Sequence, residues 1–216
     1  MVRKRILCYG DSNTFGFDPV TGERYEPQIR WTGRLQQLLG EDYCVVEEGC
    51  NGRTAYFTDP EEEWKNGMYC LKPCLNSQKP LDAVIMMLGT NDLKTMFHAS
   101  VKEVADGVGQ LVDVIHSFML EKQGFEPVIV LVSPPLIGSR IADSSFQGSF
   151  DSSAAVRSGE FSKYYRAIAQ EKNCVFFDAA EFVGPSEADS LHLMPEAHRI
   201  LAEQFAEIIR TCVKSE

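Results

Sequence analysis

Short apolar runs recur along the chain, and most of them are nearly continuous rather than alternating with polar residues. A continuous run of roughly five apolar residues is typical of a strand that is covered on both faces, as strands of parallel sheets are. The pattern therefore predicts five buried strands, at residues 5–9, 43–47, 83–88, 128–132 and 175–177.

The longer segments between these runs repeat their apolar residues with helical spacing. This spacing predicts helices at residues 31–39, 101–119, 161–169 and 196–213, with Pro195 at the start of the last one. Strands that alternate with helices are joined by right-handed crossovers. The predicted fold class is therefore α/β, a three-layer α/β/α arrangement with a five-stranded parallel, flavodoxin-like doubly wound sheet.

Length and composition fit one globular domain. Of the 216 residues, 44% are hydrophobic and 24% are charged, which is average for a soluble protein, so we expect a single domain over residues 1–216. The formal net charge of -10 disfavours nucleic acids and acidic membrane surfaces as partners, because both are polyanionic. No apolar stretch approaches the ~18 residues of a membrane span.

The cysteines and the first residues bear on the compartment. The seven cysteines are odd in number, and Cys8 and Cys174 lie in runs that resemble buried strands, which is typical of reduced core residues. Cys70 and Cys74 are spaced like half of a zinc site, but no second pair completes it, so no structural metal is expected. A cleaved signal peptide would remove Ser12, and we therefore expect a soluble cytoplasmic protein.

Two short motifs at opposite ends of the chain combine the residue types of a serine hydrolase. Gly10-Asp11-Ser12-Asn13 follows the first predicted strand, and Asp189-Ser190-Leu191-His192 precedes the last predicted helix. A carboxylate three residues from a histidine can hold one imidazole nitrogen while the other faces the serine and takes its proton. Each motif alone also fits an ordinary turn, because Asp, Ser and Asn cap helices well. Together, in the order serine, aspartate, histidine, they favour acyl transfer.

Two further positions can donate hydrogen bonds to an oxyanion. In a doubly wound sheet ligands bind outside the carboxyl ends of the strands, where residues 10–12, 89–92 and 133–135 fall. Asn91 brings an amide donor to this edge, and Gly52 lets the backbone N–H approach a ligand closely. Out of context, a turn capped by Asn91 would be the better interpretation of the stretch 87–92.

In this order the motifs resemble those of the SGNH hydrolase superfamily, also called the GDSL esterase and lipase family, over nearly the whole chain. The segments RILCYGDSNTFGFDP, RWTGRL, VVEEGCNGRT, VIMMLGTNDLK and VLVSPP resemble the branch of oligomeric bacterial arylesterases and acyltransferases. Two residues depart from the pattern. Asn13 stands where the family's name-giving motif has leucine, and Phe15 stands where the branch has tryptophan.

The resemblance implies a serine esterase that acts on small carboxylic esters through an acyl-enzyme, with water or an alcohol as acceptor. It implies that Ser12 is the nucleophile, His192 the general base and Asp189 the residue that orients it. The implied oxyanion hole consists of Ser12, Gly52 and Asn91. It further implies a homo-oligomer. We expect no cofactor and no metal.

Substrate contacts are expected from residues near the nucleophile, namely Asp11, Asn13, Phe15 and Trp31. Phe17 and Phe97 are further aromatic candidates for the pocket wall. Two segments interrupt the regular pattern, at residues 18–28 and 136–158, and we expect them to form pocket walls or subunit contacts.

Three other functions stay open at this stage. A carbohydrate acetyl esterase would use the same machinery. A metal-dependent phosphoesterase would use four candidate ligands, Asp11, Asp92, Asp189 and His192, but their spacing matches no metal signature and Ser12 would have no role. A non-catalytic flavodoxin-like domain that binds a mononucleotide would need a glycine-rich phosphate loop with a lysine, which the sequence lacks.

Overall fold

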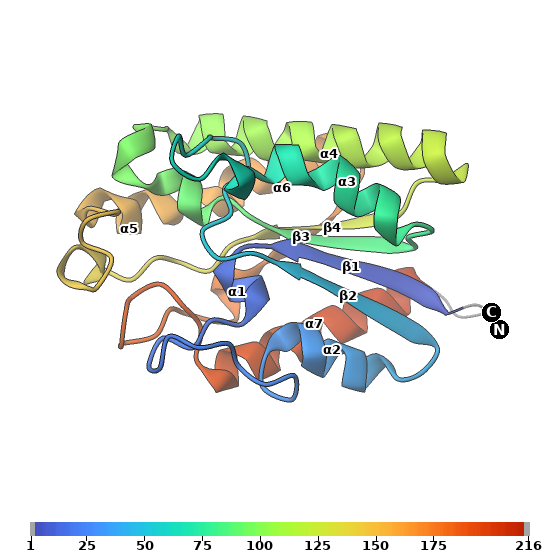
Figure 1. Cartoon of the computed structure of the whole chain (residues 1–216), viewed down its shortest axis with the longest axis horizontal. Helices are drawn as coiled ribbons and strands as arrows, with labels where there is room; N and C mark the ends of the chain where they lie inside the picture. Colours follow the sequence, from blue (N-terminus) through green and yellow to red (C-terminus); the bar gives the residue numbers. More distant parts are fainter. Residues whose placement is uncertain (1–2, 214–216) are drawn as a thin grey trace.

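Five parallel strands form one sheet in the computed structural model, which describes residues 3–213 (Figure 1). The strands are β1 (Lys4–Gly10), β2 (Tyr43–Gly49), β3 (Ala83–Met87), β4 (Val128–Ser133) and β5 (Val175–Asp178). They lie side by side in the order β2-β1-β3-β4-β5, which is the flavodoxin-like order of a doubly wound sheet. The predicted fold class is confirmed.

Helices cover both faces of the sheet (Figure 1). One face carries α3 (Gly67–Gln78), α4 (Val101–Gln123) and α6 (Phe161–Glu171), and the other carries α2 (Trp31–Leu39) and α7 (Pro195–Cys212). Two short helices, α1 (Ser12–Phe15) and α5 (Ser152–Ser158), lie near the carboxyl edge of the sheet. Within residues 3–213, no helix combines the length and the apolar composition needed to cross a bilayer.

Strand β1 shows why the apolar runs are continuous. Leu7 and Tyr9 belong to the hydrophobic core beneath α3, α4 and α6, whereas Ile6 and Cys8 belong to the core beneath α2 and α7. All four side chains are fully buried. Because successive side chains of a strand point to opposite faces, a strand between two helical layers has no position left for a polar residue.

Besides the four-residue α1, two helices were not predicted from the sequence. Helix α3 has little amphipathic patterning and contains Pro73, which removes one backbone donor and is unfavourable within a helix. Helix α5 lies inside the segment 136–158 that we expected to be a loop, and it begins where the Asp151 side chain accepts a hydrogen bond from the backbone N–H of Ser153. Both misses concern helices whose sequences give weak local signals.

The register of the sheet determines where the site can form. Gly10, the last residue of β1, lies level with Gly49 of β2 and with Met87 of β3. The chain therefore leaves these three neighbouring strands at one edge of the sheet. This brings the segments that contain Ser12, Gly52 and Asn91 together, although they are far apart in the sequence.

Candidate active site

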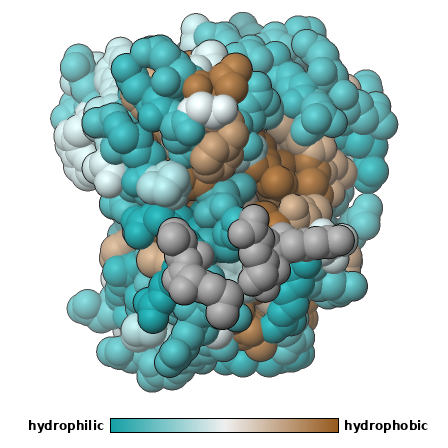
Figure 2. All heavy atoms as spheres, turned by 90° about the vertical axis from the view of Figure 1, so that its right-hand side faces the viewer, coloured by the Kyte–Doolittle hydropathy of each residue, from teal (hydrophilic) through white to brown (hydrophobic). Residues whose placement is uncertain are grey.

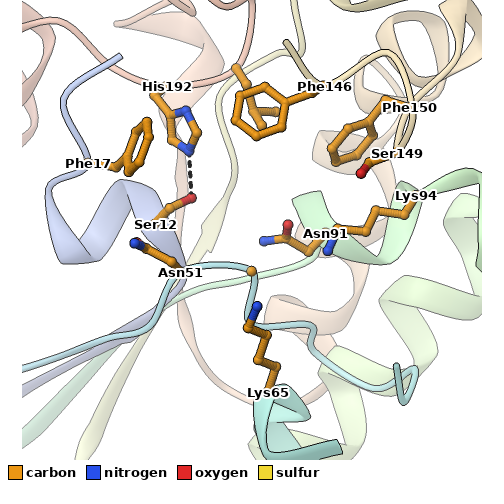
Figure 3. A pocket seen from close by; sticks show the side chains of 12 residues that line it. Ser12, Phe17, Asn51, Lys65, Asn91, Lys94, Phe146, Ser149, Phe150 and His192 are labelled. Atoms are coloured by element: carbon orange, nitrogen blue, oxygen red, sulfur yellow. Dashed lines mark hydrogen bonds between the residues drawn. The ribbon is translucent and has the colours of Figure 1, made fainter. Parts of the chain in front are cut away.

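Ser12, His192 and Asp189 form one continuous hydrogen-bonded chain. The Nε2 atom of His192 lies 2.8 Å from Oγ of Ser12 (Figure 3), and its Nδ1 atom lies 2.6 Å from Oδ2 of Asp189. All three residues are largely buried. An ionised carboxylate can only accept hydrogen bonds, so Nδ1 carries the imidazole proton and Nε2 is left to accept the proton of Ser12. This is the arrangement in which a histidine can activate a serine.

The turn after β1 presents Ser12 at the start of a helix. The Asp11 side chain caps α1 by accepting a hydrogen bond of 3.0 Å from the backbone N–H of Asn13. A side chain at Gly10 would place its Cβ only 2.1 Å from Oγ1 of Thr14, so this tight turn requires glycine. As the first residue of α1, Ser12 has a backbone N–H without an acceptor in its own helix, which is free to bind an anion.

The loop that carries the histidine is organised by Asp189. Its Oδ1 atom accepts hydrogen bonds of 2.9 Å from the backbone N–H groups of both Leu191 and His192, while Oδ2 faces the imidazole. Ser190 adopts a positive φ of 62°, which closes the turn between the two catalytic candidates. Burial raises the pKa of Asp189, but the hydrogen bonds from His192 outweigh it and hold the pKa below its usual value. The carboxylate is therefore ionised at neutral pH.

Asn13 connects the turn that carries Ser12 to the loop that carries His192. Its side-chain amide donates to the carbonyl oxygen of Leu191 at 3.4 Å and accepts from the N–H of Leu193 at 3.2 Å. We call this pair of bonds the Asn13 clamp. Leucine, the family's residue at this position, could form neither bond. The sequence prediction assigned Asn13 to substrate binding, whereas the structure places its side chain between two loops, with 4% of the residue exposed.

Gly52 and Asn91 both line the cavity that opens beside Ser12. The N–H of Arg53 donates to the carbonyl of Cys50 at 3.0 Å, and Gly52 occupies the third position of this four-residue turn with a φ of 77°. Nδ2 of Asn91 donates to the carbonyl oxygen of Arg53 at 3.1 Å, which fixes the amide and leaves its second hydrogen for a ligand. Figure 3 shows this amide nitrogen on the side of the cavity that faces Ser12.

The side chain of Asp92 binds the segment that follows Gly52. Its fully buried carboxylate accepts hydrogen bonds from the N–H groups of Ala55, Tyr56 and Phe57 at 2.7, 3.0 and 3.2 Å. Burial raises the pKa of Asp92 to about 6, and the three amides act in the opposite direction. The residues that follow Gly52 are thereby held against the end of β3.

A cavity of about 230 Å³ opens beside Ser12 (Figure 3). Its volume is below the ~300–1,000 Å³ of typical drug-sized sites, so it suits a small ester. The rings of Phe17 and Phe146 pack against His192, with centroids 4.3 and 5.4 Å from the imidazole. The wall consists of Ser12, Phe17, Asn51, Gly52, Lys65, Asn91, Lys94, Phe146, Ser149, Phe150, Leu191 and His192.

The other predicted substrate-binding residues lie behind this wall. Asp11 caps α1, and the half-buried Phe15 has the guanidinium of Arg24 over its ring at 4.6 Å. Trp31 is fully buried and donates from Nε1 to the carbonyl of Asn13 at 3.0 Å. Asp11 and Trp31 thus hydrogen-bond to the turn that carries Ser12, whereas Phe15 packs against Arg24. Phe97 likewise packs on Phe57, at 5.6 Å, away from the cavity.

Several wall residues were not predicted from the sequence. Lys94 is the second residue after Gly89-Thr90-Asn91-Asp92, and its position near that motif was a usable signal. Phe146, Ser149 and Phe150 come from the segment 136–158 that we predicted to form a pocket wall or subunit contact, but nothing in the sequence singles them out. Lys65 lies in the connection between β2 and α3, and the course of this connection depends on contacts with other elements. The sequence alone therefore does not predict that Lys65 lines the cavity.

The candidate metal ligands are used in other ways. The carboxylates of Asp11 and Asp92 bind backbone amides, and burial raises the pKa of each to about 6. Asp189 and His192 bind each other. In the described chain, residues 3–213, no group of three or more His, Cys, Asp or Glu side chains could hold a metal ion. The metal-dependent alternative therefore lacks a ligand set in this part of the molecule.

Replacing Asn91 by alanine is expected to lower kcat for an aryl acetate by roughly a hundredfold, the usual effect of losing one oxyanion donor. The measurement is steady-state turnover together with a thermal melt that shows an intact fold. Asn76→Ala, at an exposed site on α3, is the matched control. Unchanged turnover in the Asn91 variant would mean that this residue only shapes its turn.

The chain belongs to the GDSL-like lipase/acylhydrolase family, whose model matches residues 8–200. It is thus an ester-hydrolysing enzyme of the SGNH fold, as the sequence motifs predicted. No curated protein matches the chain significantly.

Solved structures give closer comparisons. An aryl esterase from M. smegmatis is 35% identical, with a TM-score of 0.90 over 97% of this chain and 100% of that protein. A carbohydrate acetylesterase from Sinorhizobium meliloti is 33% identical, with a TM-score of 0.90 over 97% of this chain and 99% of that protein. A lipase/acylhydrolase from Enterococcus faecalis, at 19% identity, shares the fold with a TM-score of 0.70 over 99% of this chain and 98% of its own.

Proposed function

We propose that this enzyme is a serine esterase that cleaves small carboxylic esters through an acyl-enzyme on Ser12. The observation that carries the proposal is the chain of 2.8 and 2.6 Å contacts from Ser12 through His192 to Asp189, which opens onto the cavity. These hydrogen bonds can activate Ser12 for catalysis only if a substrate can reach its hydroxyl group from the cavity.

In the proposed mechanism, Ser12 Oγ attacks the carbonyl carbon of the ester while its proton passes to Nε2 of His192. The negative charge that develops on the carbonyl oxygen is bound by the N–H groups of Ser12 and Gly52 and by the amide of Asn91. When the intermediate collapses, His192 gives the proton to the departing alcohol and the acyl group stays on Ser12. Water then attacks the acyl-enzyme while His192 takes its proton. His192 returns this proton to Ser12 Oγ as the bond between Oγ and the acyl carbon breaks, and the free acid leaves.

The test is a pre-steady-state measurement on a 4-nitrophenyl ester. We expect a burst of 4-nitrophenol that is stoichiometric with enzyme, because the acyl-enzyme accumulates when its hydrolysis is slower than its formation. The size of the burst should scale with enzyme concentration. In a series of esters with different acyl lengths, at least the short chains should give the burst. If no ester gave a burst and an organophosphate did not label the enzyme, the proposal would be contradicted.

A chelator distinguishes this mechanism from a metal-dependent one. We expect EDTA to change the rate of aryl acetate hydrolysis by less than about twofold, because the nucleophile and the base are both side chains. The measurement is turnover before and after dialysis against the chelator, with dialysis against plain buffer as control. A large loss that added divalent metal restores would point to metal-activated water.

Aryl acetates and acetylated sugars are the substrates we propose to test first, because the M. smegmatis and Sinorhizobium meliloti structures carry the names aryl esterase and carbohydrate acetylesterase. Acyl transfer to alcohols is part of the same proposal, since an alcohol can replace water in the attack on the acyl-enzyme. The aromatic rings beside His192 favour an apolar acceptor. The homo-oligomer, the cytoplasmic location and the single domain stay predictions.

A further inference from the structure

Two lysines contribute to the wall of the cavity at the active site (Figure 3). Lys65 ends the short 3-10 helix Glu63–Lys65, and Lys94 directly follows the 3-10 helix Thr90–Leu93 that contains Asn91. Both are partly buried, and only 17% of the Lys65 side chain is exposed. The ammonium groups of lysines are rarely buried unless they are paired. Two cations beside one small cavity contrast with the net charge of -10 of the whole chain.

The charges around these lysines are incompletely balanced. Lys65 forms an ion pair with Glu62. Lys94 has no carboxylate within 4.0 Å and no side-chain hydrogen bond to another group in residues 3–213, the part of the chain that the structure describes. Lys94 is therefore the cation that a bound anion would satisfy.

Charged groups of both signs surround Lys94. Burial lowers the pKa of Lys94, and the positive charge of Lys65 lowers it further, whereas Asp59, Glu62 and Asp92 act in the opposite direction. Of these carboxylates, Asp92 is already bound by three backbone amides and Glu62 by Lys65. An anion placed near the two ammonium groups would relieve their mutual repulsion.

The lysines are also close enough to the reacting atoms to contact a substrate. A Cβ built on Gly52 would lie 3.2 Å from Nζ of Lys65, so this ammonium group adjoins the proposed oxyanion donor. Figure 3 shows the Lys94 side chain extending along Asn91 and the Lys65 side chain rising toward the centre of the cavity. A molecule bound at Ser12 would fill the space that both side chains border.

We propose that the preferred ester substrate carries a carboxylate, on its acyl part or its alcohol part, which is bound by the ammonium groups of Lys94 and Lys65. This deepens the esterase function proposed above and rests on it. Lys94 supplies the unpaired charge. Lys65, which shares its charge with Glu62, makes the weaker contribution.

The experiment compares acid and amide versions of the same esters. One pair, 4-acetoxybenzoate and 4-acetoxybenzamide, places the carboxylate on the departing alcohol. The other pair, the mono-aryl ester of succinic acid and the aryl ester of succinamic acid, places it on the acyl group. Each kcat/KM is divided by the rate of alkaline hydrolysis of the same ester, which removes differences in intrinsic reactivity. We expect at least one acid to exceed its amide by about tenfold or more, the usual effect of a hydrogen bond to a charged group.

Variants then assign the preference to the lysines. Lys94→Met should reduce the acid-to-amide ratio by about tenfold, Lys65→Met should reduce it less, and Lys94→Arg should retain most of it because the charge is kept. Glu62→Gln should increase the ratio, since it frees Lys65 from its ion pair. Lys102→Met is the matched control, because Lys102 is exposed on α4 and pairs with Asp106. The ratio, unlike turnover alone, is not altered by a general loss of activity.

The possible outcomes are distinct. Equal rates for acid and amide in both pairs, or an acid preference that survives in Lys94→Met and Lys65→Met, would overturn the carboxylate site. If both lysine variants slowed acid and amide esters alike, the lysines would be supporting the oxyanion and the carboxylate site would again be rejected. Absence of turnover with all four esters would refute the esterase function itself, and the carboxylate site with it.

Discussion

Replacing Ser12 by alanine is expected to eliminate covalent labelling by an organophosphate and the burst of product from an aryl acetate. We expect kcat to fall by about a million-fold, because the hydroxyl that contacts Nε2 of His192 is removed. The cavity and the oxyanion donors stay in place, so binding of a substrate analogue should persist. Intact-protein mass spectrometry after treatment with the inhibitor measures the labelling directly.

Ser133→Ala provides the matched control. Ser133 is also a buried serine at the carboxyl end of a strand, β4, but it does not line the cavity. This variant should be labelled at the same site as the unmodified enzyme. Persistent stoichiometric labelling of Ser12→Ala, mapped to another residue, would reject Ser12 as the nucleophile.

Replacing Asp189 by asparagine is expected to lower kcat by roughly 10,000-fold while the fold is retained. The asparagine oxygen can still accept from the N–H groups of Leu191 and His192, which both reach Oδ1 in the structure. Its NH₂ group would then face Nδ1 of His192, where the carboxylate oxygen now lies 2.6 Å away. A donor at that position favours the tautomer with the proton on Nε2, and this tautomer cannot accept the proton of Ser12.

The measurement is single-turnover acylation, supported by circular dichroism to confirm folding. Asp178→Asn serves as the control, because Asp178 is also a largely buried aspartate that accepts from a backbone N–H, that of Ala180 at 3.1 Å. It should acylate at the rate of the unmodified enzyme. If Asp189→Asn lost less than about tenfold in acylation rate, the carboxylate would have only a structural role in its loop.

The strands and the catalytic candidates could be predicted from the sequence for the same physical reason. A strand buried on both faces needs an unbroken apolar run, and a polar motif that follows such a run must fall at the edge where parallel strands end. Ser12 and Asn91 both satisfy this rule. Helix α3 escaped prediction because Pro73 and a weak apolar stripe conceal it, and its position depends on packing against α4.

Other parts of the site depend on contacts between distant segments and leave no local signal. Trp31 looks like a pocket aromatic in the sequence, yet it is enclosed by Phe205 and by the buried His198, whose Nδ1 accepts from the N–H of Trp31 at 3.2 Å. Burial lowers the pKa of His198 to about 3, so this histidine is neutral and has no part in the relay. Lys65 likewise lies close to Gly52 because of the course of the entire connection between β2 and α3.

Figure 2 shows a largely hydrophilic face with an apolar area to the right of its centre. Several large hydrophobic residues are exposed on the described chain, among them Val20, Trp64, Tyr69 and Val156. Single exposed apolar residues are normal on soluble proteins. They do not by themselves define the subunit contacts of the predicted homo-oligomer.

The Asn13 clamp joins two loops whose hydrogen-bonded residues lie 178 and 180 positions apart. Neither loop alone contains the full hydrogen-bonded chain of Ser12, His192 and Asp189, because Ser12 lies on one side of the clamp and the other two residues lie on the other. In the proposed mechanism, opening of the clamp would separate the hydroxyl from its general base and leave a serine of ordinary, weak nucleophilicity.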